Sequence, residues 1–154
     1  NSAEVWALML ALSQDIGHKL RKYDKRAGGV QIDIRNNQLK TKQWQCKLSP
    51  HTNSAAIIAK AAYTLFERSY SWDYPIRSVT VRAIDLYAAS APEQLDMFGN
   101  VSVVDKKERL ESVVEEIHRR FGKNSILPAT ISRSLPKLPT DREVEIRMPT
   151  GMLS

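Results

Sequence analysis

A strict alternation of apolar and polar residues from Val30 to Arg35 is the feature that most constrains the fold. This period of two is typical of a β-strand with one buried face. Asn36-Asn37 follows and predicts a turn, because Asn tolerates positive φ. A second alternating run, Thr41–Leu48, places Trp44, Cys46 and Leu48 on one face. The segment 30–48 is therefore predicted to form an antiparallel hairpin.

Helical periodicity marks the segments on either side of this hairpin. Apolar residues recur at helical spacing in Asn1–Tyr23, where Asn1 and Glu4 form a capping-box pair, and in Asn53–Tyr70. Thr52 or Asn53 is expected to cap the second helix. Ile76–Tyr87 then alternates again and predicts a third strand. The order helix, strand, strand, helix, strand predicts an α+β domain at 1–88, with two helices packed on one face of an antiparallel sheet.

The other face of this predicted sheet would be polar and open to solvent. Its residues are Gln31, Asp33, Arg35, Thr41, Gln43, Gln45, Lys47, Ser78, Thr80 and Arg82. Amides, hydroxyls and a few cations hydrogen-bond phosphate oxygens without reading bases. We expect no aromatic side chain on this face, whereas binding of single-stranded RNA would require stacking platforms. An ordinary solvated sheet face is the alternative.

Composition excludes several functional classes. The chain of 154 residues carries 23 Lys and Arg against 17 Asp and Glu, an excess that weakly favours a polyanionic partner. Cys46, the single cysteine, excludes an internal disulfide, fits a reducing, cytoplasmic compartment and is expected to be a small core residue. His18, His51 and His118 lack ligand spacing, so neither a metal site nor catalytic residues are expected. No apolar run approaches the roughly 20 residues of a membrane span.

The clearest helical pattern is Asp105–Phe121, which predicts a C-terminal helix over 105–122. Asp105 and Glu108 resemble a capping box, and Gly122 is expected to end the helix. One apolar stripe is expected to satisfy a core; it consists of Leu110, Val113, Val114, Ile117 and Phe121. The charged residues are expected to form a solvated face with intrahelical ion pairs; they are Glu111, Glu115, Glu116, Arg119 and Arg120. A basic cluster, Lys19 to Arg26, is expected to complement the dipole of the first helix.

Between these regions, residues 89–104 form a predicted linker that carries Gln94-Leu95-Asp96-Met97-Phe98. Its apolar side chains either pack on their own domain or are displayed for the pocket of a partner. Because the flanking regions have apolar stripes of their own, the second interpretation is favoured. Residues 123–154 are expected to be largely irregular, with one strand-like piece at Val144–Met148.

Three stretches carry a resemblance to a known family. They are Leu12–Lys22, Pro75–Arg82, and Gln94–Phe98 followed by Lys106–Leu110 and Arg119–Gly122. Over about residues 4 to 126, the chain resembles the C-terminal part of UmuC-like Y-family translesion DNA polymerases, in particular the little finger domain. The third group is the most specific, because the peptide, its spacing and the following helix occur together.

The resemblance implies a DNA-binding and sliding-clamp-docking module of an error-prone polymerase that acts in DNA repair and the SOS response. Duplex primer–template DNA and the bacterial sliding clamp would be its partners. Arg77 and Arg82 match strand positions that approach the template backbone, and Gln94 to Phe98 match the clamp-binding peptide. The catalytic palm and its magnesium would lie in another part of the parent polymerase, so we expect no enzymatic activity and no cofactor in this chain.

Two departures from the family pattern stand out. A little finger domain usually begins with a strand before its first helix, and this chain begins within that helix, like a piece of a longer protein. The missing strand would leave an exposed sheet edge, which Val144–Met148 or a second copy of the chain could fill. The family peptide more often has Leu where Met97 stands, and Met is a flexible apolar substitute.

Two other functions compete with this interpretation. One is an independent α/β module that binds RNA or single strands, against which the lack of aromatic residues on the open face counts. The other is a protein-interaction module whose basic surface does not bind nucleic acid.

Overall fold

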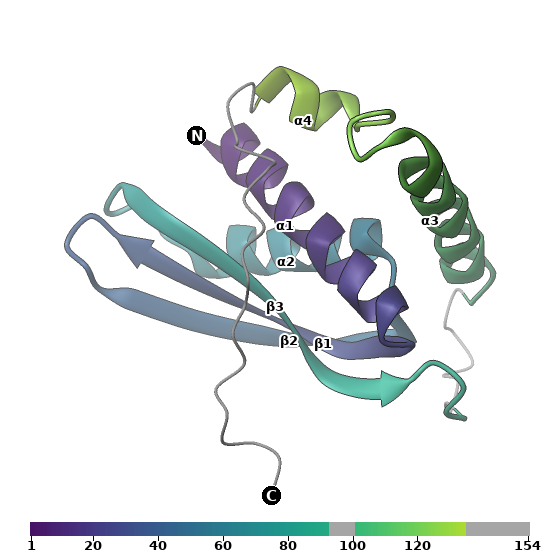
Figure 1. Ribbon diagram of the computed structural model, residues 1–154. Helices are drawn as coiled ribbons and strands as arrows, with labels where there is room; N and C mark the ends of the chain where they lie inside the picture. Colours follow the sequence, from purple (N-terminus) through teal and green to yellow (C-terminus); the bar gives the residue numbers. More distant parts are fainter. Residues whose placement is uncertain (93–100, 135–154) are drawn as a thin grey trace, which may run out of the picture.

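The computed structural model describes residues 1–92 and 101–134, and its centre is a three-stranded antiparallel sheet (Figure 1). Strand β1 (Lys25–Asn36) lies between β2 (Thr41–Thr52) and β3 (Ile76–Ala88). The predicted hairpin and third strand are confirmed, and both hairpin strands are longer than the alternation indicated. The register places Ile32 opposite Trp44 of β2 and opposite Val81 of β3. Because apolar residues alternate along each strand, one apolar face forms across all three strands.

The turn between β1 and β2 differs from the expectation in one respect. The Asn36 side-chain oxygen accepts hydrogen bonds from the backbone N–H groups of Gln38 and Lys40, both at 3.0 Å. Positive φ occurs at Leu39, at 65°, and at neither Asn36 nor Asn37. Asn36 therefore forms the turn through its side chain, and its backbone tolerance of positive φ is not used.

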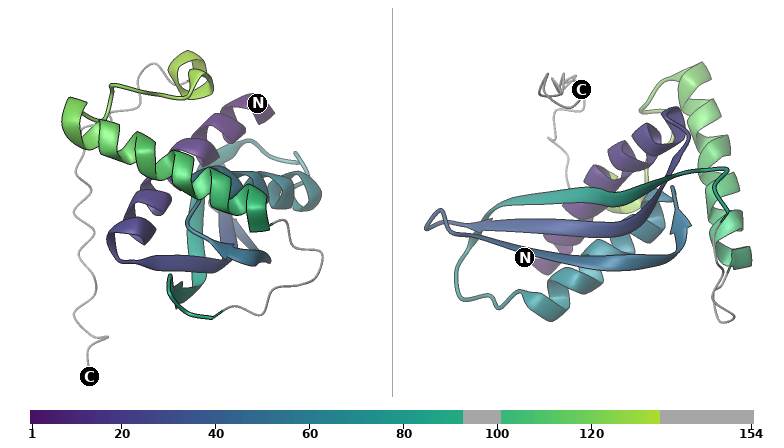
Figure 2. Two further views of the ribbon diagram at one scale, coloured as in Figure 1. Left: turned by 90° about the vertical axis from the view of Figure 1, so that its right-hand side faces the viewer. Right: turned by 90° about the horizontal axis from the view of Figure 1, so that it is seen from below.

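Helices α1 (Ser2–Lys22) and α2 (Ala55–Ser69) cover the apolar face of the sheet and leave its other face uncovered (Figures 1 and 2). The largest fully buried side chains include Met9, Ile32, Ile58 and Phe66, one or more from each layer. The helices approach closely at Gly17, where an added Cβ would lie 3.1 Å from the Cβ of Ala55. The predicted α+β architecture, with two helices on one face, is confirmed.

The predicted cap of α1 is confirmed, and the predicted cap of α2 is not. The Asn1 side chain accepts from the Glu4 N–H at 3.0 Å and completes the predicted capping box of α1. The cap of α2 is Ser54, not Thr52 or Asn53. The Thr52 hydroxyl instead accepts from the Ser54 N–H at 3.0 Å, so it supports the cap from the end of β2.

Two further helices lie beyond the sheet. Helix α3 (Val101–Phe121) begins before Asp105, so the predicted capping box of Asp105 and Glu108 is wrong. Gly122 has φ 95° and ends the helix as expected. Helix α4 (Ala129–Ser134) lies within a stretch predicted to be irregular and contacts α1. Gln94–Phe98 and Val144–Met148 lie outside the described residues, and none of the helices in the described part combines the length and apolarity that a membrane span requires.

Candidate nucleic-acid interface

The uncovered face of the sheet brings the predicted polar residues together. The register aligns them in three rows across the strands: Gln45-Gln31-Arg82, Gln43-Asp33-Thr80 and Thr41-Arg35-Ser78. Lys47 lies beyond the first row, opposite Gly29. We call these ten predicted residues, together with Arg77, the polar sheet face. Since all three rows are built on neighbouring strands, their side chains form one continuous surface.

Arg77 reaches this face through an irregularity in β3. Ser78 pairs with Arg35, whereas Ile76 pairs with the next residue of β1, Asn36, so Arg77 is an extra residue. Ile76 and Val79 both pack against the core. Arg77 and Ser78 therefore share the open side of the strand, as the two residues of a β-bulge do. Simple alternation from Val79 would have placed Arg77 on the helix side.

A carboxylate lies in the middle of the polar sheet face. The Asp33 side chain is only 14% exposed and lies 3.3 Å from the guanidinium of Arg82. The Gln31 amide donates a hydrogen bond to the Asp33 carboxylate, at 3.2 Å. Arg82 is itself 59% exposed, so its remaining N–H groups face solvent. Sequence patterning placed Asp33 on this face but did not indicate that it would pair with Arg82.

One end of the sheet is more apolar than the rows suggest. Ile84 lies opposite Gly29, where an added Cβ would come within 2.9 Å of the Ile84 side chain. Nearby on the chain, Tyr87 stacks on His51 with 4.2 Å between ring centroids and 7° between ring planes. The three rows themselves contain no aromatic residue, as expected, and the aromatic pair lies beyond them at the strand ends.

Helix α3 is held on the domain by carboxylates, contrary to the prediction of a solvated charged face. Glu111 accepts from the Ser54 hydroxyl at 2.6 Å and from the backbone N–H groups of Ala55 and Ala56 at 2.7 and 3.2 Å. These donors belong to the first turn of α2, where a helix terminus has unpaired N–H groups and favours negative charge. Glu111 also pairs with Arg21 at 3.1 Å.

Two more carboxylates extend this contact, which we call the α3 carboxylate cluster (Glu108, Glu111 and Glu115). Glu108 is buried and accepts from the Thr52 hydroxyl at 2.9 Å and from Arg26 at 2.7 Å. Glu115 pairs with Arg21 and, at 2.9 Å, with His18. Arg21 and Arg26 were expected to complement the dipole of α1, and they instead form ion pairs with glutamates of α3. Their partners on α3 lie 82 or more residues away along the chain, which is why no local pattern indicated them.

The rest of α3 also departs from the prediction. Only Glu116, Arg119 and Arg120 behave as the expected solvated ion pairs. Hydrogen bonds from Arg119 and Arg120 lower the pKa of Glu116 to about 2. Much of the apolar stripe does not face the core, because Leu110, Val113 and Phe121 are exposed, while Val114 and Ile117 are partly buried. The carboxylate cluster occupies the inward side together with the buried Val104.

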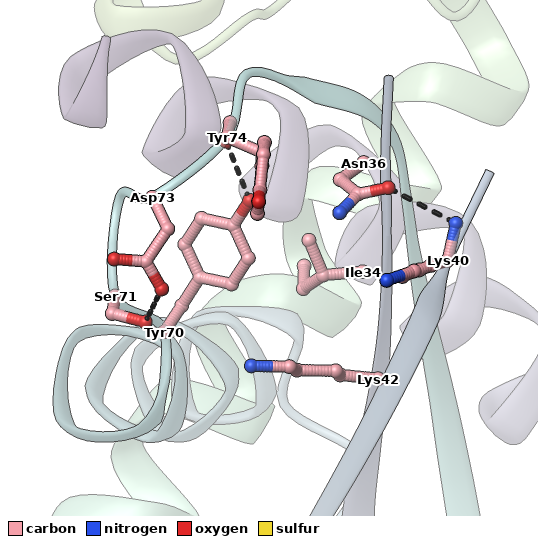
Figure 3. Close-up of a pocket in the computed structure, with 8 residues that line it drawn as sticks. All are labelled: Ile34, Asn36, Lys40, Lys42, Tyr70, Ser71, Asp73 and Tyr74. Carbon is pink, nitrogen blue, oxygen red and sulfur yellow. Dashed lines mark hydrogen bonds between the residues drawn. The ribbon is translucent and has the colours of Figure 1, made fainter. Parts of the chain in front are cut away.

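A cavity of about 210 Å³ lies between the hairpin end and the segment 70–74 (Figure 3). There the Tyr70 hydroxyl donates to the Tyr74 carbonyl at 2.8 Å, and Ser71 donates to Asp73 at 2.5 Å. Desolvation, followed by the nearby charge of Asp73, raises the pKa of Tyr70. These polar groups are engaged in the local turn, and the described part of the chain contains no cluster of metal ligands.

Cys46 is partly buried and packs against the core cluster, in agreement with the sequence interpretation. Burial raises the pKa of its thiol. A raised thiol pKa disfavours the thiolate that nucleophilic chemistry requires.

Comparison with known proteins assigns the family. Residues 1–97, which include α1, the whole sheet and α2, match the model of the impB/mucB/samB family C-terminal domain. The chain belongs to this family. The resemblance to the C-terminal, little finger domain of UmuC-like Y-family polymerases is thereby confirmed, and so is the little finger type of the α+β fold.

Curated relatives agree with this assignment. The chain is 32% identical over 126 residues to a protein named DNA polymerase IV from Acetivibrio thermocellus, a match that covers 82% of this chain and 32% of that protein. It is 26% identical over 132 residues to a DNA polymerase IV from Alkaliphilus oremlandii, covering 80% of this chain and 33% of the relative. A DNA polymerase IV from Oceanobacillus iheyensis is 27% identical over 124 residues, covering 80% of this chain and 29% of the relative. The chain thus spans about a third of the length of these relatives.

Proposed function

We propose that this chain is the DNA-holding and clamp-docking module of a lesion-bypass DNA polymerase. The polar sheet face grips the phosphates of duplex primer–template DNA, and Gln94–Phe98 binds a bacterial sliding clamp. The parent protein is a cytoplasmic DNA polymerase whose catalytic palm, with its magnesium, lies outside this chain. The chain itself holds its substrate and catalyses no step.

The observation that carries this proposal is the make-up of the polar sheet face. Amides and hydroxyls lie there beside cations, on a surface that none of the helices in residues 1–92 and 101–134 covers. Such groups bind phosphate oxygens and carry little sequence information. A polymerase that copies damaged templates benefits from this, because contacts to the backbone do not reject an altered base.

Charge reversal on the face tests DNA binding. Arg77→Glu combined with Arg82→Glu should weaken duplex binding at least tenfold at low salt, because both changes remove a phosphate contact and add repulsion. The loss should be similar for duplexes of different sequence, measured by fluorescence anisotropy. With roughly 3–5 cationic contacts, the wild-type affinity should fall with salt at a log–log slope of about −3 to −4.

Lys60→Glu combined with Arg68→Glu is the matched control. It makes the same change in net charge, but both residues lie on α2, on the covered side of the sheet. If the control weakens binding as much, general charge explains the loss. If the loss is confined to one sequence, the face does not act by gripping phosphates.

The clamp interaction has its own test. Leu95→Ala combined with Phe98→Ala should abolish binding to the sliding clamp, because a few apolar anchors supply most of the affinity of such a peptide. Duplex binding and the melting temperature should not change. Glu93→Ala, one residue before the peptide, should retain clamp binding. A sharp fall in melting temperature, with no clamp binding by the wild type, would show that the peptide belongs to the core.

A separate comparison addresses the alternative functions. An independent RNA- or single-strand-binding module would prefer single strands to duplex, and the aromatic-free rows oppose this because they offer no stacking platform. A protein-interaction module would bind neither single-stranded nor duplex DNA. Titration of duplex and single-stranded DNA of the same sequence distinguishes the three functions.

A further inference from the structure

The charged and the apolar side chains of α3 lie on different sides of the helix from those expected for an amphipathic helix. Its inward side is occupied by the α3 carboxylate cluster, which hydrogen-bonds the start of α2 and pairs with arginines of α1 and β1. Its apolar stripe lies on another side of the helix, where Leu110 is 63%, Val113 58% and Phe121 75% accessible, and Val114 and Ile117 are partly buried. Val103 continues the stripe toward the N-terminus, and Ile126 and Leu127 continue the exposed apolar surface beyond the helix. Exposed apolar surface of this extent marks an interaction site.

The charges beside the stripe have one dominant sign. Lys106, Arg109 and Arg120 follow its flank at helical spacing. The exposed carboxylate of Glu116 is already bonded to Arg119 and Arg120. The other three glutamates of the helix face the domain and Asp105 is partly buried, so the exposed charges beside the stripe are mainly basic.

A groove continues this surface on the other flank. A hollow of about 500 Å³ lies between β2 and α2, and Lys107 of α3 forms part of its wall. Its floor includes Ile57, Ala61 and Leu65, and its other cations are Lys47, Lys60 and Arg68. No carboxylate lines it. The stripe and the hollow together offer apolar surface bordered by cations from three elements.

The occupant can be inferred from these charges. A second copy is disfavoured, because antiparallel pairing of two α3 helices about Val113 places Lys106 opposite Arg120, and parallel pairing places each cation opposite itself. Like charges placed together at an interface are costly. A phosphate backbone would satisfy the cations but leave Leu110 and Phe121 without apolar partners. An acidic amphipathic helix supplies both kinds of group, and a helix fits a groove.

We propose that the outer side of α3, with the groove beside it, is a docking site for an acidic amphipathic helix of a partner protein. The helix lays its apolar residues on the stripe and turns its carboxylates toward Lys106, Lys107 and Arg120. The stripe on α3 contains no residue of the polar sheet face or of the 94–98 peptide, and the groove shares Gln45 and Lys47 with that face.

The test uses the full chain and three fluorescein-labelled synthetic peptides. The first is an amphipathic helix with a Leu/Ile stripe and flanking glutamates, the second has Lys in place of every Glu, and the third is a scrambled form of the first. By anisotropy, the acidic peptide should bind at least tenfold more tightly than either control. Lys106→Glu combined with Arg120→Glu should invert the preference between the acidic and basic peptides, a result that unfolding cannot produce.

The stripe is tested in the same assay. Leu110→Ser combined with Phe121→Ser should weaken the acidic peptide at least tenfold without lowering the melting temperature, because both side chains are exposed. A marked fall in melting temperature would show that the stripe is already packed, and the proposal would fail. Equal binding of all three peptides, or of none, would also overturn it.

Other occupants would be revealed in parallel measurements. A dimer in sedimentation equilibrium that Leu110→Ser dissociates would assign the stripe to a second copy. Loss of duplex binding in the serine variant would assign it to nucleic acid, and stripe-dependent binding to anionic lipid vesicles would assign it to a membrane. If peptide binding requires deletion of residues 135–154, the chain's own C-terminal segment is the occupant. Each of these results would contradict an acidic protein partner.

Discussion

At the scale of single residues, Asp33 has the least expected position. A carboxylate at the centre of a cationic surface reduces the attraction for phosphate, yet Asp33 is held there by Arg82 and Gln31. Because Arg82 is more than half exposed, the ion pair restricts the arginine without removing it from solvent. Asp33 therefore orients Arg82 and at the same time weakens the field of the polar sheet face.

Asp33→Asn should consequently strengthen duplex binding several-fold at low salt. The amide keeps the shape and removes the negative charge, which leaves Arg82 free to contact a phosphate. The log–log salt slope should become steeper by up to about 0.9, the value for one added contact. Asp15→Asn is the matched control, since Asp15 is exposed on α1 and lies on the covered side of the sheet. Weaker binding by Asp33→Asn would show that orientation of Arg82 outweighs repulsion by the carboxylate.

At the scale of elements, α3 illustrates how charged contacts can set the orientation of an amphipathic helix. Glu111 satisfies N–H groups at the start of α2 that would otherwise need a cap or water. Arg21 joins Glu111 and Glu115, so one arginine of α1 ties together two turns of α3. The helix is therefore held by its polar side, and its apolar side is left outward.

Glu111→Ala should lower the free energy of unfolding by about 2 kcal/mol, because it removes hydrogen bonds between a charged group and partly buried donors. Amide hydrogen exchange in 101–121 should accelerate more than exchange in the sheet, since α3 loses its main anchor. Glu116→Ala removes a carboxylate that bonds only within α3, and its effect on domain stability should be small. Equal destabilisation by the two variants would mean that the contact with α2 does not hold α3.

The sequence predicted the sheet better than α3 for a physical reason. In β1, β2 and β3, the alternation that buries Val30, Ile32 and Ile34 also fixes which residues occupy the opposite face, so core and candidate site were predicted together. The bulge at Arg77 and the pairing of Asp33 with Arg82 depend on the neighbouring strand and leave no local signal. For α3, periodicity identified the helix correctly, but the expectation that an apolar stripe faces a core failed. The decisive partners, Arg21 and Thr52, lie far away in sequence.

At the scale of the whole molecule, two surfaces of different chemistry lie on different sides of one small domain. The polar sheet face is uncovered on one side, and α3 runs past the end of the sheet, where it meets the starts of α2 and of β1 (Figure 2). α1 and α2 lie on the other face of the sheet, and α3 lies at the end of the strands (Figure 2). A duplex on the sheet and a helix on the α3 stripe contact different residues, apart from Gln45 and Lys47, which line the groove and belong to the polar sheet face.

This separation predicts additive behaviour. Arg82→Glu should weaken duplex binding alone, and Leu110→Ser with Phe121→Ser should weaken only the acidic probe peptide. The triple variant should show both losses unchanged, because substitutions at distant sites without shared partners add to within about 0.5 kcal/mol. Anisotropy titrations of each variant with one ligand in the presence and absence of the other would measure the coupling. A coupling well above that limit would mean that the sheet and α3 are linked, and the α3 carboxylate cluster, which joins α3 to β1 through Arg26, would be the contact to test next.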